Sequence, residues 1–156
     1  MKKLDSGIVA FFRNQGFVIV STIDEDSSIH NSCKGIVRID SKGLVYLFDL
    51  YKAKTFQNLK NNSTISLTAV DEHKFQGYCL KGRAKIVETE SLGSDILALW
   101  DDKITSRATK RVIKNIHEEK GSSNHPEILL PKPEYLIVVQ VEEIINLTPG
   151  KIEEAK

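Results

Sequence analysis

Short runs of β-branched, aromatic and aliphatic residues, broken by polar turns, recur along this chain and are typical of β-strands. Six segments have this character, at 17–23, 29–39, 44–48, 64–70, 75–87 and 135–147. The first three are close enough together to form a meander. Gly77 and Gly82 lie within the fifth segment and indicate a bulge, or a close approach of two backbones, inside a long strand.

Two shorter segments have the residue spacing of a helix face instead. The segment 5–15 carries Asp5 as a candidate N-cap, and Gly16 is placed to end this helix in a left-handed turn. The segment 51–62 interrupts the strand pattern and has apolar residues three positions apart. We expect a short helix in each segment.

From Ser94 to about Glu119, apolar residues recur at every fourth position, which predicts a long amphipathic helix. A proline-bearing loop at 120–134 separates this helix from the last strand. Six strands in mostly antiparallel spacing, with one long helix before the last, predict a mainly β fold, a six-stranded antiparallel barrel with short flanking helices. A doubly wound α/β sheet would need strands and helices to alternate regularly, and they do not.

Composition agrees with one globular domain. The chain has 156 residues, of which 40% are hydrophobic and 28% charged. We place the domain at 1–148 and treat 149–156 as a polar C-terminal tail. The 22 Lys and Arg nearly balance 21 Asp and Glu, so no overall field attracts the chain to nucleic acid or to an anionic membrane. Any basic site must then be local.

Two further features bear on where the protein works. No stretch approaches the ~18 apolar residues of a membrane span, and no apolar signal core follows the basic N-terminus. Cys33 and Cys79 have neither the number nor the spacing of a disulfide framework or a zinc site. We therefore expect a soluble protein of the reducing cytoplasm.

The basic stretch after the third strand segment is the first candidate site. Lys52, Lys54 and Thr55 lie together where a strand gives way to a helix. Unpaired backbone N–H groups and the positive end of the helix dipole favour anions there, so these residues would suit a phosphate. The alternative is a solvated basic turn without a ligand, because lysines are common on exposed turns.

A second candidate lies in the segment 29–39, where small and polar residues interrupt an apolar pattern. Strand alternation places Ser32 and Lys34 on one face and Cys33 and Gly35 on the other. A planar ligand laid along this strand would meet polar groups without steric conflict. The alternative is an edge strand with one solvated face.

Basic residues also share one face of the long helix, at Lys103, Arg107, Lys110, Arg111 and Lys114. Such a stripe can contact nucleic-acid phosphates, but no aromatic residues interleave with it. A solvated face opposite an ordinary packed face is the simpler interpretation. Metal-ligand, Walker, GxGxxG and GxSxG patterns do not occur in the sequence, so metal-dependent hydrolysis, nucleotide hydrolysis and Rossmann binding lack support.

Three stretches, taken in order, resemble the pyridoxamine 5′-phosphate oxidase-like family of FMN-binding split barrels. They are FVIVSTIDEDSSIHNSCKGIVRID, GLVYLFDLYKAKTFQNLKNNSTISLTAV and GYCLKGRAKIVE, which cover roughly residues 17–88. The most specific parts are YKAKTFQNLKNN and LKGRAKIVE. The resemblance implies a split β-barrel that forms a homodimer and holds FMN at the subunit interface.

The resemblance also implies which residues would contact FMN. Those at the phosphate are Lys52, Lys54 and Thr55, and those along the isoalloxazine ring are Ser32, Cys33 and Lys34. Asp49 would lie near the ribityl chain, and Gly77 with Tyr78 would close the site. A cation such as Lys34 near N1 and the C2 carbonyl would raise the flavin's reduction potential, because these atoms gain negative charge on reduction.

The function expected from this resemblance is that of a flavin-dependent oxidoreductase acting on a small molecule. The alternative is a non-catalytic flavin-binding or electron-transfer module, since no residue stands out as a catalytic acid, base or nucleophile. The chain has no arginine after Arg111 and no histidine after His125, which argues against vitamin B6 oxidation. Relatives also use deazaflavin or haem, but the paired lysines favour the compact terminal phosphate of FMN.

Overall fold

The computed structural model describes residues 1–91, 94–118 and 130–150. Its strands are β1 (Val18–Ile23), β2 (Ile29–Lys34), β3 (Ile36–Ile39), β4 (Leu44–Asp49), β5 (Thr64–Asp71), β6 (Gln76–Glu88) and β7 (Tyr135–Asn146). Its helices are α1 (Ser6–Arg13), α2 (Lys54–Asn61) and α3 (Ser94–Glu118), with a short 3-10 helix η1 (Thr89–Ser91). The mainly β fold and the three expected helices are confirmed. Most of the expected loop at 120–134 and most of the polar tail lie outside the described residues.

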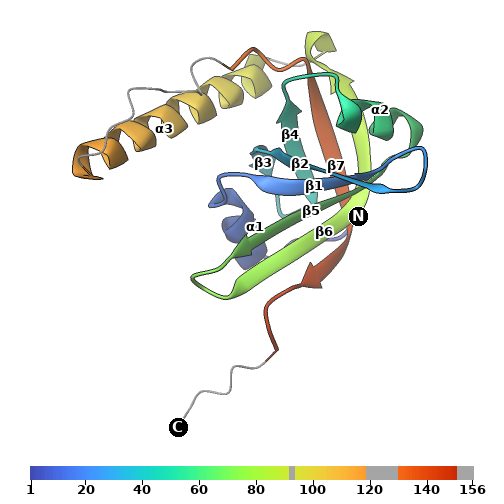
Figure 1. Ribbon diagram of the computed structural model, residues 1–156, viewed down its shortest axis with the longest axis horizontal. Coiled ribbons are helices and arrows are strands. Elements are labelled where there is room, and N and C mark those ends of the chain that lie inside the picture. Colours follow the sequence, from blue (N-terminus) through green and yellow to red (C-terminus); the bar gives the residue numbers. More distant parts are fainter. Residues whose placement is uncertain (92–93, 119–129, 151–156) are drawn as a thin grey trace.

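All seven strands form one curled, open antiparallel sheet in the order β2-β1-β5-β6-β7-β4-β3 (Figure 1). β2 and β3 follow each other in the chain but lie at opposite edges of this sheet. Only Gly35 separates them, and one residue spans less than about 4 Å. The sheet must therefore curl until its two edges meet at this corner, which gives a split barrel.

The expectation of one continuous strand over 29–39 is wrong, and the described residues form a sheet of seven strands rather than six. Residues before Gly35 pair with β1, whereas residues after it pair with β4. The first three segments therefore do not form a simple meander. Their β-branched composition continues across the break and gives no sign of it.

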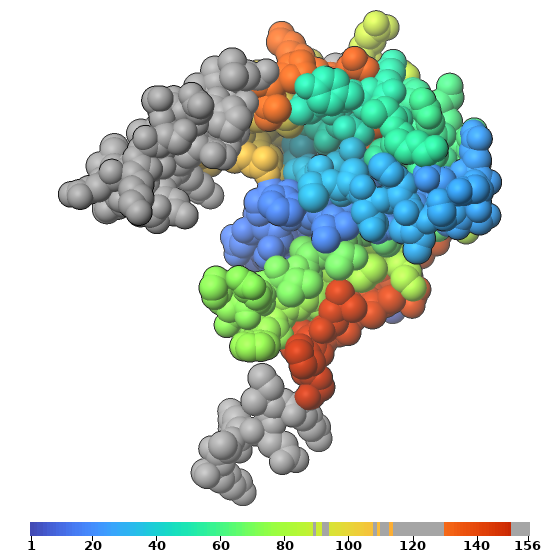
Figure 2. Space-filling view, viewed as in Figure 1, coloured from blue at the N-terminus to red at the C-terminus, as the bar shows by residue number. Residues whose placement is uncertain are grey.

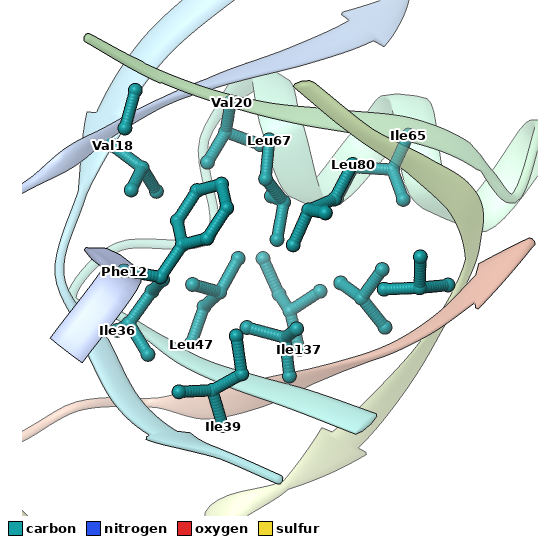
Figure 3. Packing of buried hydrophobic residues seen from close by; sticks show 14 of the residues in the cluster. Phe12, Val18, Val20, Ile36, Ile39, Leu47, Ile65, Leu67, Leu80 and Ile137 are labelled. Atoms are coloured by element: carbon teal, nitrogen blue, oxygen red, sulfur yellow. The ribbon is translucent and has the colours of Figure 1, made fainter. Parts of the chain in front are cut away.

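The barrel interior is filled by apolar side chains that alternate along the strands. Figure 3 shows them converging from opposite walls, with Phe12 of α1 among them. The fully buried members include Val20, Leu67, Leu80 and Val139, one from each of four strands. This alternation of inward apolar and outward polar residues is the period-two pattern that predicted the strands.

Helix α1 begins as expected, because the Asp5 carboxylate accepts a hydrogen bond of 2.8 Å from the backbone N–H of Ile8. Its end differs from expectation. The cap residue Asn14 is right-handed, with a φ of −83°, and Gly16 is not in the left-handed region. The N–H of Asn14 reaches the carbonyls of Ala10 and Phe11, so the last turn closes without a left-handed residue.

The expected irregularity in β6 is confirmed at Gly82. The pairing of β6 with β7 shifts register between Lys81 and Gly82. A Cβ at this position would lie only 1.9 Å from the carbonyl oxygen of Gln140, so the two backbones approach too closely for any side chain. At Gly77 a Cβ would lie 3.2 Å from Cγ2 of Val70, which is also a tight approach.

Helix α3 projects from the barrel, with its N-terminal half against the sheet (Figure 1). The indole of Trp100 packs edge-on against Phe48 of β4, with ring centroids 5.4 Å apart. Two cavities, described below, lie between this helix and the sheet. Among the described residues, no helix is both long and apolar enough to cross a bilayer.

Candidate functional site

The predicted phosphate-binding residues lie at the start of α2, which borders the β1–β2 segment in the space-filling view (Figure 2). The N-cap of α2 is Ala53, and no side chain within the described residues caps this end of the helix. Its first-turn N–H groups therefore lack the acceptor that a Ser, Asp or Asn cap would supply. The same end carries Lys52 and Lys54, so a bound anion would supply the missing acceptor beside two positive charges.

Each lysine has a carboxylate partner in this structure. Lys52 Nζ lies 2.9 Å from Oε2 of Glu88, and Lys54 Nζ lies 3.9 Å from Oδ1 of Asp24. The hydrogen bond from Lys52 to Glu88 raises the pKa of Lys52, so this lysine stays charged. Both lysine side chains are nearly half exposed, at 43% and 47%, and ion pairs this exposed contribute little. A doubly charged phosphate can therefore displace the two carboxylates from these lysines.

Thr55 is placed differently from the lysines. Its side chain is buried, and its Oγ1 lies 3.1 Å from Oγ of Ser32, with either hydroxyl able to donate. This contact joins the first turn of α2 to the inward face of β2. The structure therefore brings the predicted phosphate end and the predicted ring strand together, although the Thr55 hydroxyl is occupied by Ser32.

Asn58, one turn further along α2, was not singled out from the sequence. It is 2% exposed, and its Nδ2 donates to Oγ1 of Thr22 at 3.0 Å and to Oδ1 of Asp24 at 2.6 Å. These bonds fix α2 against β1 and the turn that follows it. Asn58 thus holds the start of the helix in place beside β2.

Lys34 and Asp49 form a buried ion pair. Lys34 Nζ lies 2.5 Å from Oδ2 of Asp49, and the two side chains are only 7% and 13% exposed. Lys34 shares the inward side of β2 with Ser32, as strand alternation predicts, whereas Cys33 is exposed. Because β2 lies at one edge of the sheet and β4 next to the other, the pair ties the two edges together beside Gly35.

The buried Tyr135 completes this cluster and was missed by sequence reasoning. Its hydroxyl donates to the same Oδ2 of Asp49 at 2.5 Å, and its ring packs edge-on against Phe56 of α2 at 4.9 Å. Burial, and then the hydrogen bond to Asp49 and its negative charge, raise the pKa of Tyr135. The phenol therefore remains a neutral donor. It links α2 to the Lys34–Asp49 pair.

A cavity of about 330 Å³ opens beside this cluster. Its wall includes Cys33, Lys34 and Asp49, together with the aromatic rings of Phe48 and Trp100. A larger cavity of about 850 Å³ lies next to it, between α1, β3 and α3. The volumes are those of ordinary small-molecule sites.

The expectation that the basic stripe of α3 faces solvent is wrong for two of its members. Lys103 and Arg107 are half-buried and line both cavities. The Nη2 atom of Arg107 is buried, and no acceptor within the described part of the chain binds it. A Cβ on Gly35 would lie 3.3 Å from this Nη2, so the glycine leaves room for the guanidinium.

Gly77 and Tyr78 are not brought to this cluster. They lie on β6, which two strands, β1 and β5, separate from β2. The ring of Tyr78 packs edge-on against Phe11, with centroids 5.1 Å apart. Among the described residues, no group of three or more His, Cys, Asp and Glu is arranged to hold a metal ion.

Comparisons with known proteins identify relatives of this arrangement. The family model for pyridoxamine 5′-phosphate oxidase matches residues 4–144. No curated protein matches the chain significantly.

Solved structures share the fold. HupZ of Group A Streptococcus has a TM-score of 0.63 at 19% identity, covering 94% of this chain and 96% of its own. A Clostridium acetobutylicum protein related to general stress protein 26, of the pyridoxinephosphate oxidase family, has a TM-score of 0.60 at 18% identity, covering 95% and 93%. An F420 reductase has a TM-score of 0.59 at 14% identity, covering 91% and 98%. At such identities the likeness concerns the fold alone.

Replacing Tyr135 by Phe should lower the free energy of unfolding at neutral pH by about 1.5–3 kcal/mol, because a buried carboxylate loses a hydrogen-bond donor. Urea unfolding measures this, with the exposed Tyr51→Phe as control. Above about pH 10 the native protein should lose stability, since Tyr135 ionises in the unfolded chain but not in the folded one. That loss should be smaller in Tyr135→Phe. Equal stability and equal alkaline slopes would contradict the assigned hydrogen bond.

Proposed function

This chain belongs to the pyridoxamine 5′-phosphate oxidase family, and from that premise we propose that it binds FMN and acts as an oxidoreductase on a small molecule. Members of the family generally bind a flavin. The observation that carries the proposal is the contact between Ser32 and Thr55, which joins the basic, uncapped start of α2 to the polar face of β2. One elongated cofactor with a phosphate at one end and a ring at the other suits such a site.

At the phosphate end, Lys52 and Lys54 would bind the FMN phosphate in place of Glu88 and Asp24. The two exposed lysine–carboxylate pairs contribute little, and a phosphate dianion carries about twice the charge of a carboxylate, so it would compete well for both ammonium groups. Thr55 stays a predicted contact, and its buried hydroxyl would also keep β2 against α2.

At the ring end, the cavity of about 330 Å³ offers both polar and apolar walls. Lys34 and Asp49 supply polar groups, and Phe48 with Trp100 supplies flat apolar surface. Polar groups fix the orientation of a ring, and aromatic side chains exclude water from its face. Bound flavin would supply hydride and electron transfer, and the protein would supply orientation and access.

The larger cavity is the proposed place of the substrate. Its described lining includes four cationic residues, Arg13, Arg38, Lys103 and Arg107, against one carboxylate, Asp102. The whole chain has a net charge of only +1, so this is a local concentration of positive charge. Among the described residues the buried Nη2 of Arg107 has no acceptor, which favours a substrate with a carboxylate or phosphate group.

The proposed dimer has a candidate surface on the outer face of the sheet. Phe17, Ile19 and Val70 surround one shallow depression there and are 61%, 44% and 61% exposed. Exposed apolar residues that lie together are typical of an interface. Gly77 lies directly against Val70, so a second copy on this face would bring Gly77 and Tyr78 near the interface, where they could close the partner's site.

The proposed location is the cytoplasm. Cys33 and Cys79 are both free thiols in the structure. A cysteine such as Cys33, exposed on an edge strand, is stable as a thiol in a reducing compartment.

Replacing both Lys52 and Lys54 by Ala should weaken FMN binding on the order of a hundredfold, because each lysine contributes a charge-assisted hydrogen bond. A fluorescence titration of the flavin measures this. Riboflavin lacks the phosphate, so its affinity should be the same for wild type and variant. The pair Lys74→Ala and Lys81→Ala, exposed lysines elsewhere, is the control. An unchanged FMN affinity would refute the phosphate assignment.

Replacing Arg107 by Gln should weaken a response to anions and also make the unliganded protein more stable, because it removes the buried Nη2 donor, which finds no acceptor among the described residues. Arg107→Gln and a surface control, Arg83→Gln, are compared in the Lys52→Ala, Lys54→Ala background, which removes the flavin phosphate site. Inorganic phosphate at constant ionic strength should raise Tm there, with binding weakened about tenfold or more by Arg107→Gln but not by the surface control Arg83→Gln. An undiminished phosphate response would contradict the substrate assignment.

Replacing Val70 by Glu should convert the proposed dimer to a monomer, because it places a charge in the apolar contact. Sedimentation equilibrium measures the mass, and Thr109→Glu, which adds the same charge to exposed α3, is the control. A wild type that is monomeric, or a dimer unaffected by Val70→Glu, would rule out this interface.

A further inference from the structure

We propose that Asp49 and Tyr135, together with Lys34, set the reduction potential of the bound flavin. This inference rests on the proposed FMN site. A lysine beside a flavin ring was expected from the sequence, but the structure shows that this lysine is not a free cation. A carboxylate holds it, and a phenol holds the carboxylate.

The geometry makes the three residues one unit. Lys34 Nζ and the Tyr135 hydroxyl both bind Oδ2 of Asp49 at 2.5 Å. The three come from β2, β7 and β4, and Asp49 and Tyr135 face each other directly in the β4–β7 pairing. Tyr135 is fully buried, so the phenol has little freedom to turn away. Lys34 is therefore held at one place in the cavity wall.

The charges of this unit oppose each other at the proposed ring. Two-electron reduction of a flavin with uptake of one proton adds one negative charge to the ring system. A neighbouring cation favours that charge and raises the potential, whereas a carboxylate lowers it. Lys34 and Asp49 together have no net charge, so the carboxylate cancels much of the effect of the lysine. The partly desolvated setting makes both effects stronger than they would be in water.

Tyr135 modifies this balance in the opposite direction. Its hydroxyl donates to Oδ2, so the positive end of its dipole offsets part of the carboxylate's charge. Removing the donor leaves Asp49 more negative toward the ring. Removing the charge of Asp49 leaves Lys34 more positive. The two substitutions should therefore move the potential in opposite directions, and a purely structural role would not produce such opposite shifts.

The test is the midpoint potential of FMN bound to wild type, Asp49→Asn and Tyr135→Phe, measured by dithionite titration against a reference dye. Asp49→Asn should favour reduced over oxidised flavin by a factor of ten or more, a rise of about 30 mV for a two-electron couple. Tyr135→Phe should lower the potential. Glu143→Gln, which removes a carboxylate from an exposed ion pair with Lys81, is the control and should leave it unchanged.

The possible outcomes separate this inference from the proposed function. Unchanged potentials in both variants, or shifts of the same sign, would overturn the inference while leaving FMN binding intact. A wild type that does not bind FMN would overturn both. If Asp49→Asn does not fold, Tyr135→Phe alone tests the inference, because it keeps both charges of the ion pair. A lowered potential in Tyr135→Phe would support the inference, and an unchanged potential would overturn it.

Discussion

A single residue carries this chain from one edge of its sheet to the other. Gly35 separates β2 from β3, and those strands are the two ends of the sheet, so the edges must meet beside it. The buried Lys34–Asp49 pair lies next to this corner and holds the edges together. The rest of the site depends on the same closure, because it brings the inward face of β2 to the end of β4.

From that corner, contacts run continuously to the start of α2. Asp49 accepts from Tyr135, and the ring of Tyr135 packs on Phe56 of α2. The hydroxyls of Ser32 and Thr55 join β2 to the same helix. The two groups of basic residues consequently differ in kind. Lys52 and Lys54 are exposed and able to exchange partners, whereas Lys34 is held by a buried carboxylate.

Much of the fold followed from local pattern, since strand alternation and helix spacing depend on neighbouring residues alone. The predictions that failed depended on contacts between residues far apart in the chain. The break at Gly35 is decided by which strands pair on either side, not by the composition of 29–39. Tyr135 contacts Asp49 because the two residues, 86 positions apart in the chain, are paired in the register of β4 and β7. Arg107 looked solvated because helix spacing cannot show that a cavity lies under a basic face.

The absorption spectrum of the freshly purified protein shows whether this site holds FMN. We expect flavin bands, and a flavin that heat releases and that phosphatase converts to riboflavin. A colourless protein that does not take up added FMN would rule out the proposed cofactor, as would a spectrum of haem or of a deazaflavin.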